Sequence, residues 1–474
     1  MRNLFIVFYC LVSALTIKAN GQDSLWKIQT TDYHGTYYGA TVANGGIGIL
    51  PWKEPFSIRH VMLNHVFDSA TPQDVSRVLR GINPFNLQMQ INGQTVNGDN
   101  ISRWEQCIDM KEATHNTHFT CDGKADVSYS ICALRNLPYA GLVRVEVVAL
   151  GDMYLTVSNP IEIPDEYKNI GSKLVNVNVN GNDIKIVRTW ALSKYREQKV
   201  SASSAFIYDK NSSVQQQYNG SGQISISLKK GEKFFFTLLG AVCTGRDFID
   251  PYNESDREVI YGAKEGLTRL MDGHRKLWNE MWKGDIVIEG DDEAQRTVRF
   301  ALYNLYSNAR KGSRLSIPPF GLSSQGYNGH IFWDTEFWMY PPMLFMNQGI
   351  ARTMMDYRTD RLEAACQKAL SYGYDGAMFP WESDDAGEEA CPTWALTGPF
   401  EHHITADIAI AAWNYYCMSG DQRWLREEGF PLMEKVAEFW VSRVEKNDDG
   451  SYSIRNVVCA DEYAEGDDNA FKIG

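Results

Sequence analysis

The sequence predicts a multidomain β plus α protein, in which an N-terminal antiparallel β-sandwich is followed by a helical linker and a helical toroid or barrel. Apolar residues recur at every second position between about residues 22 and 250, as in half-buried strands, whereas after residue 260 they recur with the 3.6-residue period of helices. Long loops rich in aromatic and acidic residues separate the predicted helices, which is typical of a helical framework that carries a site on its loops.

Residues 1–21 are expected to be a signal peptide rather than part of the fold. Arg2 gives the segment its positive start, and residues 4–17 form an apolar stretch shorter than the roughly 20 residues that span a bilayer. Small residues precede Gln22, where we expect cleavage. The protein is therefore expected to be exported, periplasmic or secreted, with no membrane span. An uncleaved N-terminal anchor is the alternative.

Residues 22–255 are predicted to form the β-sandwich. Residues 174–179 alternate apolar with polar and resume this pattern at 184–187, and the Asn-Gly dipeptide between them favours a hairpin turn. Residues 224–228 and 234–239 flank Gly231 in the same manner and are predicted to pair as a second hairpin, while 143–150 and 153–157 add two strands. Many short strands separated by turns are typical of an antiparallel sandwich.

Residues 256–284 are predicted to be a helical linker, because an apolar stripe runs from Leu267 to Trp282. His274 lies within this stripe, so a core histidine is favoured over a ligand. The toroid is assigned to residues 285–474. Its helices are expected where apolar residues share one face, at residues 298–309, 362–370, 404–416 (with a stop at Gly420) and 430–444.

Composition excludes several classes of function. The 474 residues carry 46 Lys and Arg against 59 Asp and Glu, a net charge of −13 without a basic cluster, so no nucleic-acid partner is expected. The nine cysteines show no metal-ligand spacing. We interpret them as buried thiols, with one disulfide between Cys107 and either Cys121 or Cys132 as the alternative.

Tryptophans lie beside carboxylates in the second half of the chain. Nine of the thirteen tryptophans fall from Trp278 onward, and three clusters combine aromatic and acidic residues at 329–336, 380–385 and 459–463. Aromatic faces pack against the C–H faces of a pyranose, and carboxylates accept its hydroxyl protons. In any one cluster the tryptophan could instead be core and the carboxylate a helix cap. Three clusters together favour a sugar site.

These segments carry a resemblance to a known family. Residues 285–291, 329–336, 376–383, 403–409 and 461–463, followed by Asp468 and Asn469, occur in the order and spacing of family 65 of the glycoside hydrolases. This family includes maltose, trehalose and kojibiose phosphorylases and kojibiose hydrolase-like inverting α-glucosidases. The resemblance implies an N-terminal β-sandwich, a helical linker and an (α/α)6 barrel, of which this chain contains only about half.

The resemblance also implies that Glu462 is the general acid. That role needs a carboxyl group kept protonated by partial burial and within reach of the glycosidic oxygen. Tyr463 and Trp413 are candidates for its apolar surroundings, and Glu465 is a weaker alternative for the acid itself. In the family, the group that works with the acid lies beyond position 474. It is a water-activating carboxylate in hydrolases and a set of phosphate-binding donors in phosphorylases.

By the same resemblance, one group of side chains lines the subsite for the non-reducing glucose, and Asp334 is expected to bind its hydroxyls. The substrate-binding candidates are Trp333, Asp334, Trp381, Glu382, His330 and Glu336. This sequence departs from the family pattern around the acid, with Cys459 and Ala460 in place of Gly-Pro and Ala464 in place of His. These departures affect contacts with the leaving sugar and not the acid.

We expect an exported inverting α-glucosidase that hydrolyses short α-glucosides, with kojibiose-like α-1,2 linkages favoured by the resemblance. A phosphorylase conserves bond energy as a sugar phosphate, which is lost outside the cell, so export favours hydrolysis. A family 65 disaccharide phosphorylase that releases glucose 1-phosphate is the first alternative. The second is a truncated, non-catalytic carbohydrate-binding fragment with an exposed apolar seam. A purely structural sandwich does not account for the three clusters.

No metal or organic cofactor is predicted. The adjacent histidines 402 and 403 point about 100° apart on a helix and make a poor chelating pair. The acidic loop at residues 382–389 is expected to be solvated or substrate-facing, with calcium binding as the alternative. The expected partner is an α-glucoside disaccharide or oligosaccharide, and the family resemblance favours a homodimer.

Overall fold

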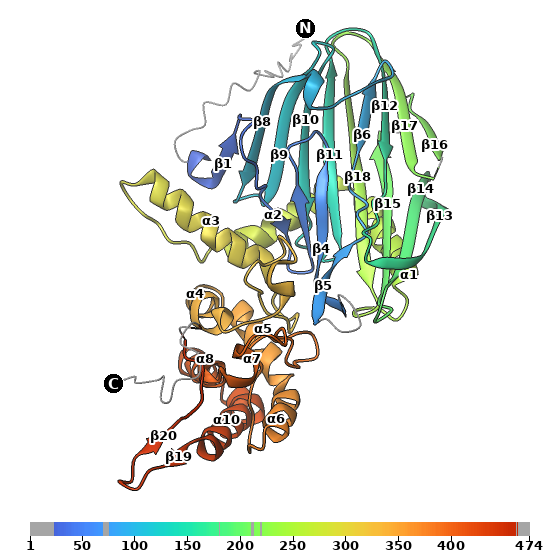
Figure 1. Ribbon diagram of the computed structural model, residues 1–474. Coiled ribbons are helices and arrows are strands. Elements are labelled where there is room, and N and C mark those ends of the chain that lie inside the picture. Colours follow the sequence, from blue (N-terminus) through green and yellow to red (C-terminus); the bar gives the residue numbers. More distant parts are fainter. Residues whose placement is uncertain are drawn as a thin grey trace, which may run out of the picture.

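The computed structural model describes residues 23–69, 75–179, 181–209, 213–218, 220–460 and 462. A large β-sandwich stands above a smaller group of helices (Figure 1), so the predicted order of a β-sandwich followed by helices is confirmed. The predicted signal peptide, residues 1–21, lies outside the described residues.

The described strands form antiparallel sheets of nine, five, four and two strands. In spatial order, the nine-stranded sheet contains β1 (Lys27–Thr30), β8 (Ile101–Asp109), β9 (Thr114–Cys121), β10 (Ala125–Ala133), β11 (Ala140–Ala149), β18 (Lys233–Thr244), β15 (Lys199–Tyr208), β14 (Asn182–Ser193) and β13 (Tyr167–Val179). The five-stranded sheet contains β16 (Gln215–Tyr218), β17 (Gly222–Leu228), β12 (Met153–Asn159), β6 (Gln88–Ile91) and β7 (Gln94–Thr95). The smaller sheets are β2 (Val42–Ala43), β3 (Ile47–Pro51), β4 (Ile58–Ser69) and β5 (Ser76–Gly81), and the hairpin of β19 (Glu445–Lys446) and β20 (Tyr452–Ser453).

The first predicted hairpin is confirmed. Strands β13 and β14 pair in antiparallel register, with Val179 opposite Asn182 at the turn end. On β11, the apolar residues Val143, Val145 and Val147 are buried and alternate with more exposed polar residues, as expected for a strand with one face on a core. The alternation read from the sequence therefore describes the real faces of these strands.

The second predicted hairpin is wrong in its pairing, although both strands exist. Strand β17 pairs with β12, from Met153 opposite Leu228 to Asn159 opposite Gly222. Strand β18 pairs instead with β11 and β15 in the other sheet. The turn at Gly231, where φ is +86°, thus passes the chain between sheets. Strand β18 pairs with the longer strands β11 and β15 rather than with β17. The sequence of the turn favours a hairpin but carries no information about these distant partners.

The linker consists of α1 (Pro251–Glu265) and α2 (Leu267–Met281). Helix α1 begins five residues before the predicted boundary of the linker, because the Asp250 side chain accepts a hydrogen bond from the Asn253 N–H and Pro251 occupies the first turn.

His274 on α2 is a core residue, as predicted. Its Nδ1 accepts a hydrogen bond from the Arg135 N–H at 3.0 Å and its Nε2 donates to the Glu112 carbonyl at 2.9 Å. Burial lowers the pKa of His274 to about 4. Both ring nitrogens are therefore used in holding α2 on the sandwich.

Short helices and loops make up the rest of the described chain. The helical turns of the sandwich are η1 (Asp23–Trp26) and η2 (Gly98–Asn100). The helical domain contains α3 (Asp292–Asn308), η3 (Gly326–Gly329), η4 (Thr335–Met339), α4 (Tyr340–Met346), α5 (Gln348–Thr359), α6 (Leu362–Ser371), α7 (Thr397–Phe400), α8 (His403–Ser419), α9 (Gln422–Trp424), η5 (Leu425–Gly429) and α10 (Phe430–Arg443). All four helices predicted for this region are present, and α8 stops at Gly420 in the left-handed conformation, as expected.

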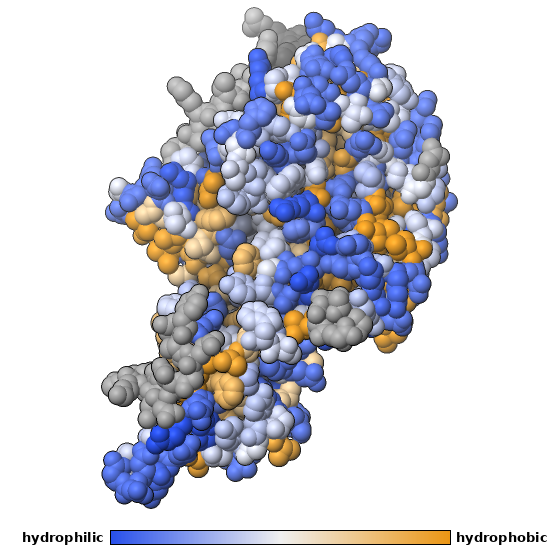
Figure 2. Space-filling model, viewed as in Figure 1, coloured by the Kyte–Doolittle hydropathy of each residue, from blue (hydrophilic) through white to orange (hydrophobic). Residues whose placement is uncertain are grey.

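Large apolar side chains stay exposed on the helical domain. Trp338, Phe345, Ile410 and Trp413 are each more than half exposed and lie on η4, α4 and α8. In the space-filling view, hydrophilic residues cover most of the sandwich, and apolar residues gather at α3, on the lower right of the sandwich and among the helices below (Figure 2). Among the described residues, no helix is long and apolar enough to cross a bilayer.

The thiol interpretation is confirmed for the described cysteines, but their burial only in part, since Cys417 is exposed. No disulfide joins the eight cysteines in the described part of the chain. Cys107 is half-buried, whereas Cys121 and Cys132 are buried. Burial raises the pKa of the Cys107 thiol to about 12. The alternative disulfide of Cys107 with Cys121 or Cys132 is therefore wrong.

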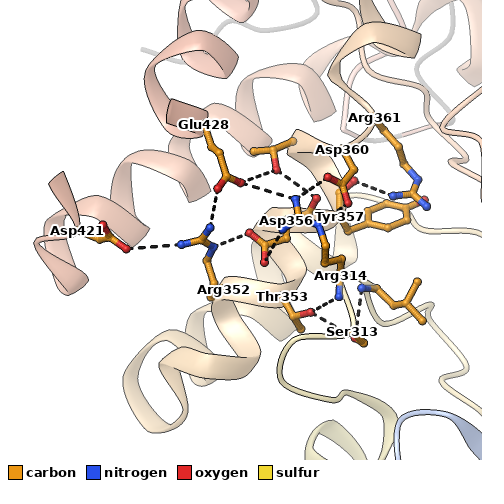
Figure 3. Close-up of polar contacts among 12 residues, drawn as sticks. Ser313, Arg314, Arg352, Thr353, Asp356, Tyr357, Asp360, Arg361, Asp421 and Glu428 are labelled. Atoms are coloured by element: carbon orange, nitrogen blue, oxygen red, sulfur yellow. Dashed lines mark hydrogen bonds and ion pairs between the residues drawn. The ribbon is translucent and has the colours of Figure 1, made fainter. Parts of the chain in front are cut away.

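An ion-pair network fastens α5 to the segment before α10 (Figure 3). Arg352 of α5 lies 2.5 Å from Asp356, 2.6 Å from Glu428 and 3.5 Å from Asp421. Arg314 approaches Asp356 to 3.4 Å from the opposite side. Asp356 is thus a buried anion shared by two arginines, and the network as a whole links three segments that are far apart in the sequence.

We expect Asp356→Asn to lower the free energy of unfolding by about 2 kcal/mol, because two cations lose the carboxylate that they face in a buried site. Urea denaturation of both proteins measures this difference. Asp360→Asn is the control, since Asp360 is 40% exposed and its ion pair is with Arg314, and exposed pairs contribute below about 1 kcal/mol. Equal losses in the two variants would contradict the role given to Asp356.

Candidate active site

Two of the three predicted clusters lie side by side. The Ile331 N–H donates to the Ser383 carbonyl at 2.9 Å, and the Ser383 N–H donates to the Ile331 carbonyl at 3.0 Å. This short antiparallel bridge places the segment that leads into η4 beside the acidic loop. Residues 50 positions apart in the sequence therefore share one site.

The two indoles of these clusters face a common neighbour. The Trp333 and Trp381 rings lie 6.5 Å apart with a 32° angle between their planes. The imidazole of His403 packs edge-on against both, at 4.7 Å from Trp333 and 5.4 Å from Trp381. Trp333 is half-buried and Trp381 is buried. The two indoles and the imidazole form one aromatic platform, and Trp333 is its more exposed indole.

His403 is an ion-paired residue that the sequence analysis did not assign to the site. Its Nδ1 lies 2.7 Å from Asp407 Oδ2, and its Nε2 lies 2.9 Å from Glu401 Oε1. Burial lowers the pKa of His403, but the hydrogen bonds and charges of Asp407 and Glu401 outweigh it and raise that pKa to about 9. His403 is therefore an imidazolium beneath the indoles at neutral pH. The available signal was the four-residue spacing of His403 and Asp407 on one helix.

This pKa predicts a pH dependence of stability. Because the pKa of folded His403 lies above the unfolded value near 6.5, its contribution of about 3 kcal/mol is complete below pH 6.5 and is lost as pH rises through about 9. Urea denaturation of the protein and of His403→Gln at pH 6 and pH 9.5 measures it. We expect the difference in unfolding free energy between the two proteins to shrink at the higher pH. A constant difference would contradict the charge assigned to His403.

The carboxylates beside the platform have different surroundings. Asp334 is half-buried, and burial raises its pKa. In the part of the chain that the structure describes, no other residue donates a hydrogen bond to its side chain. Glu382 is 8% exposed and its Oε2 lies 2.8 Å from His330 Nδ1. Asp334 is the better placed of the two to accept a sugar hydroxyl directly.

Two of the predicted substrate contacts need correction. Glu336 forms a bidentate ion pair with Arg358, with both N–O distances at 2.8 Å and both side chains inaccessible to solvent. His330 is fully buried between Glu382 and the sandwich. Neither side chain reaches a surface on which a sugar could lie. The ion pair of Glu336 is structural, and His330 acts on the site only through Glu382.

The acidic loop is held by buried polar contacts. Glu389 accepts hydrogen bonds from the backbone N–H groups of Trp381 at 2.8 Å, Glu382 at 3.0 Å and Cys391 at 3.1 Å. Lys368 Nζ lies 2.5 Å from the same carboxylate. Glu389 thus fixes the backbone that carries the second indole and its neighbouring carboxylate, and its charge is paired with that of Lys368.

Glu462, the predicted general acid, is exposed rather than partly buried as we expected. The pKa of the buried Glu401 carboxyl is raised, mainly by burial and in part by the nearby charge of Glu462. Glu401 in turn binds His403. Trp413 is 52% exposed, and Tyr463, the other expected apolar neighbour, lies outside the described residues. The catalytic role of Glu462 stays a prediction.

Family models match most of the chain. The model described as "Glycosyl hydrolase family 65, N-terminal domain" matches residues 39–281, and "Glycosyl hydrolase family 65 central catalytic domain" matches residues 299–473. The first match ends with α2 at residue 281, and the second begins within α3 at residue 299. The boundary between the two matches thus coincides with the passage from the linker to the helical domain.

Curated relatives match along nearly the whole chain. A kojibiose hydrolase of Flavobacterium johnsoniae is 41% identical over 99% of this chain and 70% of its own length, and one of Mucilaginibacter mallensis is 37% identical over 98% and 70%. A solved structure described as a putative kojibiose phosphorylase from the human microbiome shares the fold, with a TM-score of 0.79 and 16% identity over 94% of this chain and 63% of its own. The chain belongs to glycosyl hydrolase family 65.

Proposed function

We propose that the protein hydrolyses short α-glucosides, with the α-1,2 linkage of kojibiose as the favoured substrate. The observation that supports this most is the pairing of the Trp333 and Trp381 indoles beside Asp334 and Glu382. The two relatives that match nearly all of the chain are named kojibiose hydrolases. The residue types at the site and the relatives' names thus favour the same substrate class.

In this proposal each side chain has a distinct task. The glucose ring lies on the indoles, and Asp334 accepts its hydroxyl protons. Glu462 donates a proton to the glycosidic oxygen as the bond breaks, and a second carboxylate activates the attacking water on the opposite face of the ring. We assign that second role to none of the residues described above. Attack from the opposite face releases β-glucose from an α-linkage.

The test is the identity of the products from kojibiose. We expect the complete gene product to release β-glucose in phosphate-free buffer, as followed by proton NMR within the first minutes. A requirement for phosphate with release of glucose 1-phosphate would replace hydrolysis by phosphorolysis. Binding of kojibiose without any turnover would leave a carbohydrate-binding protein and refute the enzymatic proposal.

We also propose that the protein is exported after cleavage before Gln22. The support is the sequence of residues 1–21, with its positive start, short apolar stretch and small residues before the cleavage point. N-terminal sequencing of the protein from the producing cells should find Gln22 as the first residue in the exported fraction. A chain that retains Met1 and sediments with membranes would favour the uncleaved anchor.

A further inference from the structure

A serine of the sandwich reaches the candidate active site. Strands β4 and β5 run to the end of the sandwich that faces the helices (Figure 1). Ser76, the first residue of β5, places its Oγ 3.2 Å from His330 Nε2, and His330 Nδ1 lies 2.8 Å from Glu382 Oε2. A residue more than 250 positions earlier in the chain thus lies two hydrogen bonds away from the predicted sugar-binding carboxylate.

The hydroxyl hydrogen of Ser76 is used in a hydrogen bond to another residue. Its hydroxyl donates to Asp384 Oδ2 at 3.0 Å. Asp384 also accepts from Arg196 Nη2 at 3.3 Å and from the backbone N–H groups of Ala386 at 2.9 Å and Gly387 at 3.2 Å. A carboxylate with this many donors is an acceptor toward the serine. Since a hydroxyl carries one proton, Ser76 Oγ must accept from His330, and Nε2 must carry a hydrogen.

The hydrogen on Nε2 limits the roles that Nδ1 of the same His330 ring can take. With Nε2 protonated and hydrogen-bonded to Ser76, Nδ1 is directed at Glu382, either as the donor of an ion pair or as the acceptor from a protonated carboxyl. In both states Glu382 Oε2 is held by His330. Oε1, to which no donor among the described residues is bonded, is the oxygen left to meet a sugar hydroxyl.

Packing from the sandwich fixes the plane of the same ring. Phe67 of β4 stacks on His330 with centroids 5.6 Å apart and a 12° interplanar angle, and His330 has no exposed surface. The ring can therefore neither rotate freely nor exchange its partners for water. Two neighbouring strands of the sandwich determine the orientation and the tautomer of a histidine that belongs to the helical domain.

We propose that Ser76 is a positioning residue of the sugar site, which keeps Nε2 of His330 protonated, excludes the tautomer with its hydrogen on Nδ1 alone, and through the ring sets the orientation of Glu382. The proposal rests on the proposed function, because it assigns Glu382 to the bound glucose. It goes beyond that function in making the β-sandwich a contributor to sugar affinity. All of the contacts that support the proposal are between residues that the structure describes.

The experiment compares Ser76→Ala, Ser76→Thr and Ser204→Ala in the full chain. We expect Ser76→Ala to weaken binding of glucose and kojibiose about tenfold in calorimetry, since a buried donor loses its acceptor. The threonine variant keeps the hydroxyl and should restore affinity. Ser204 is a matched control, because it is a buried serine of β15 that donates to Asn159 at 2.6 Å. Its loss should leave sugar binding unchanged.

Nitrogen-15 NMR of the histidine side chains gives a second readout, which does not require a sugar. We expect the His330 resonance, identified by its absence in His330→Gln, to show a protonated Nε2 in the wild type and a mixture of tautomers in Ser76→Ala. If the wild type binds neither sugar, the proposed function fails, while the tautomer result still decides the link between Ser76 and His330. Unchanged tautomer and unchanged affinity in Ser76→Ala would overturn the inference.

Discussion

Replacing Arg358 by methionine is expected to lower the free energy of unfolding by about 3–5 kcal/mol. Arg358 and Glu336 are both buried, and the guanidinium donates twice to the carboxylate and once, at 3.2 Å, to the Phe332 carbonyl. Without the arginine, a carboxylate is left in a site that water does not reach. Burial already raises the pKa of Glu336 against the opposing charge of Arg358. Urea denaturation measures the loss.

The double variant Arg358→Met with Glu336→Leu separates the cost of an unpaired charge from the loss of packing. We expect it to recover most of the stability, because well-packed apolar residues can replace a buried ion pair at little cost. A single variant that loses less than about 1 kcal/mol, or a double variant no more stable than the single one, would contradict this account. Since η4 follows Asp334, the single variant should also weaken glucose binding.

Replacing Glu462 by glutamine is expected to reduce turnover of kojibiose about a thousandfold, because the leaving sugar then departs without a proton. Affinity for kojibiose should change little, since the indoles and Asp334 are untouched. An activated substrate such as α-glucosyl fluoride, whose leaving group needs no protonation, should still be turned over. This combination distinguishes loss of an acid from loss of structure.

Glu465→Gln is the matched control for this experiment, because Glu465 is the neighbouring carboxyl that could serve in place of Glu462. We expect its rates on both substrates to stay close to those of the wild type. Steady-state kinetics on the two substrates gives the comparison. If Glu465→Gln loses activity on kojibiose alone and Glu462→Gln does not, the acid has been assigned to the wrong residue.

The order of domains and most elements follow from periodicity. The two-residue period identified the strands β11, β12, β13, β14, β17 and β18, and the helical period identified α2, α3, α6, α8 and α10. Helices α4 and α5 were missed, because Pro341 and Pro342 at the start of α4 suggest a loop unless they are recognised as first-turn residues. The partner of β17 could not be predicted either, since the sequence of a turn carries no information about the distant strands that can pair with the edges of β17.

At the site, the sequence identified residue types and neighbours but not long-range partners. Trp333 and Trp381 were predicted to share a site, and the structure brings them together. Nothing local links Glu336 with Arg358, or His330 with Ser76, because these contacts depend on how distant segments pack. The four-residue spacing of His403 and Asp407 was a local signal for an ion pair. The adjacent His402 and His403 were instead considered as a metal-binding pair.

The order of the strands in the sandwich limits how the gene segment that encodes it can recombine. The chain passes between the nine-stranded and five-stranded sheets repeatedly, for example from β11 to β12, from β12 to β13 and from β17 to β18. Neither sheet corresponds to a continuous piece of the gene. Recombination within this region would leave strands without their neighbours, so the sandwich can be gained, lost or exchanged between genes only as one block.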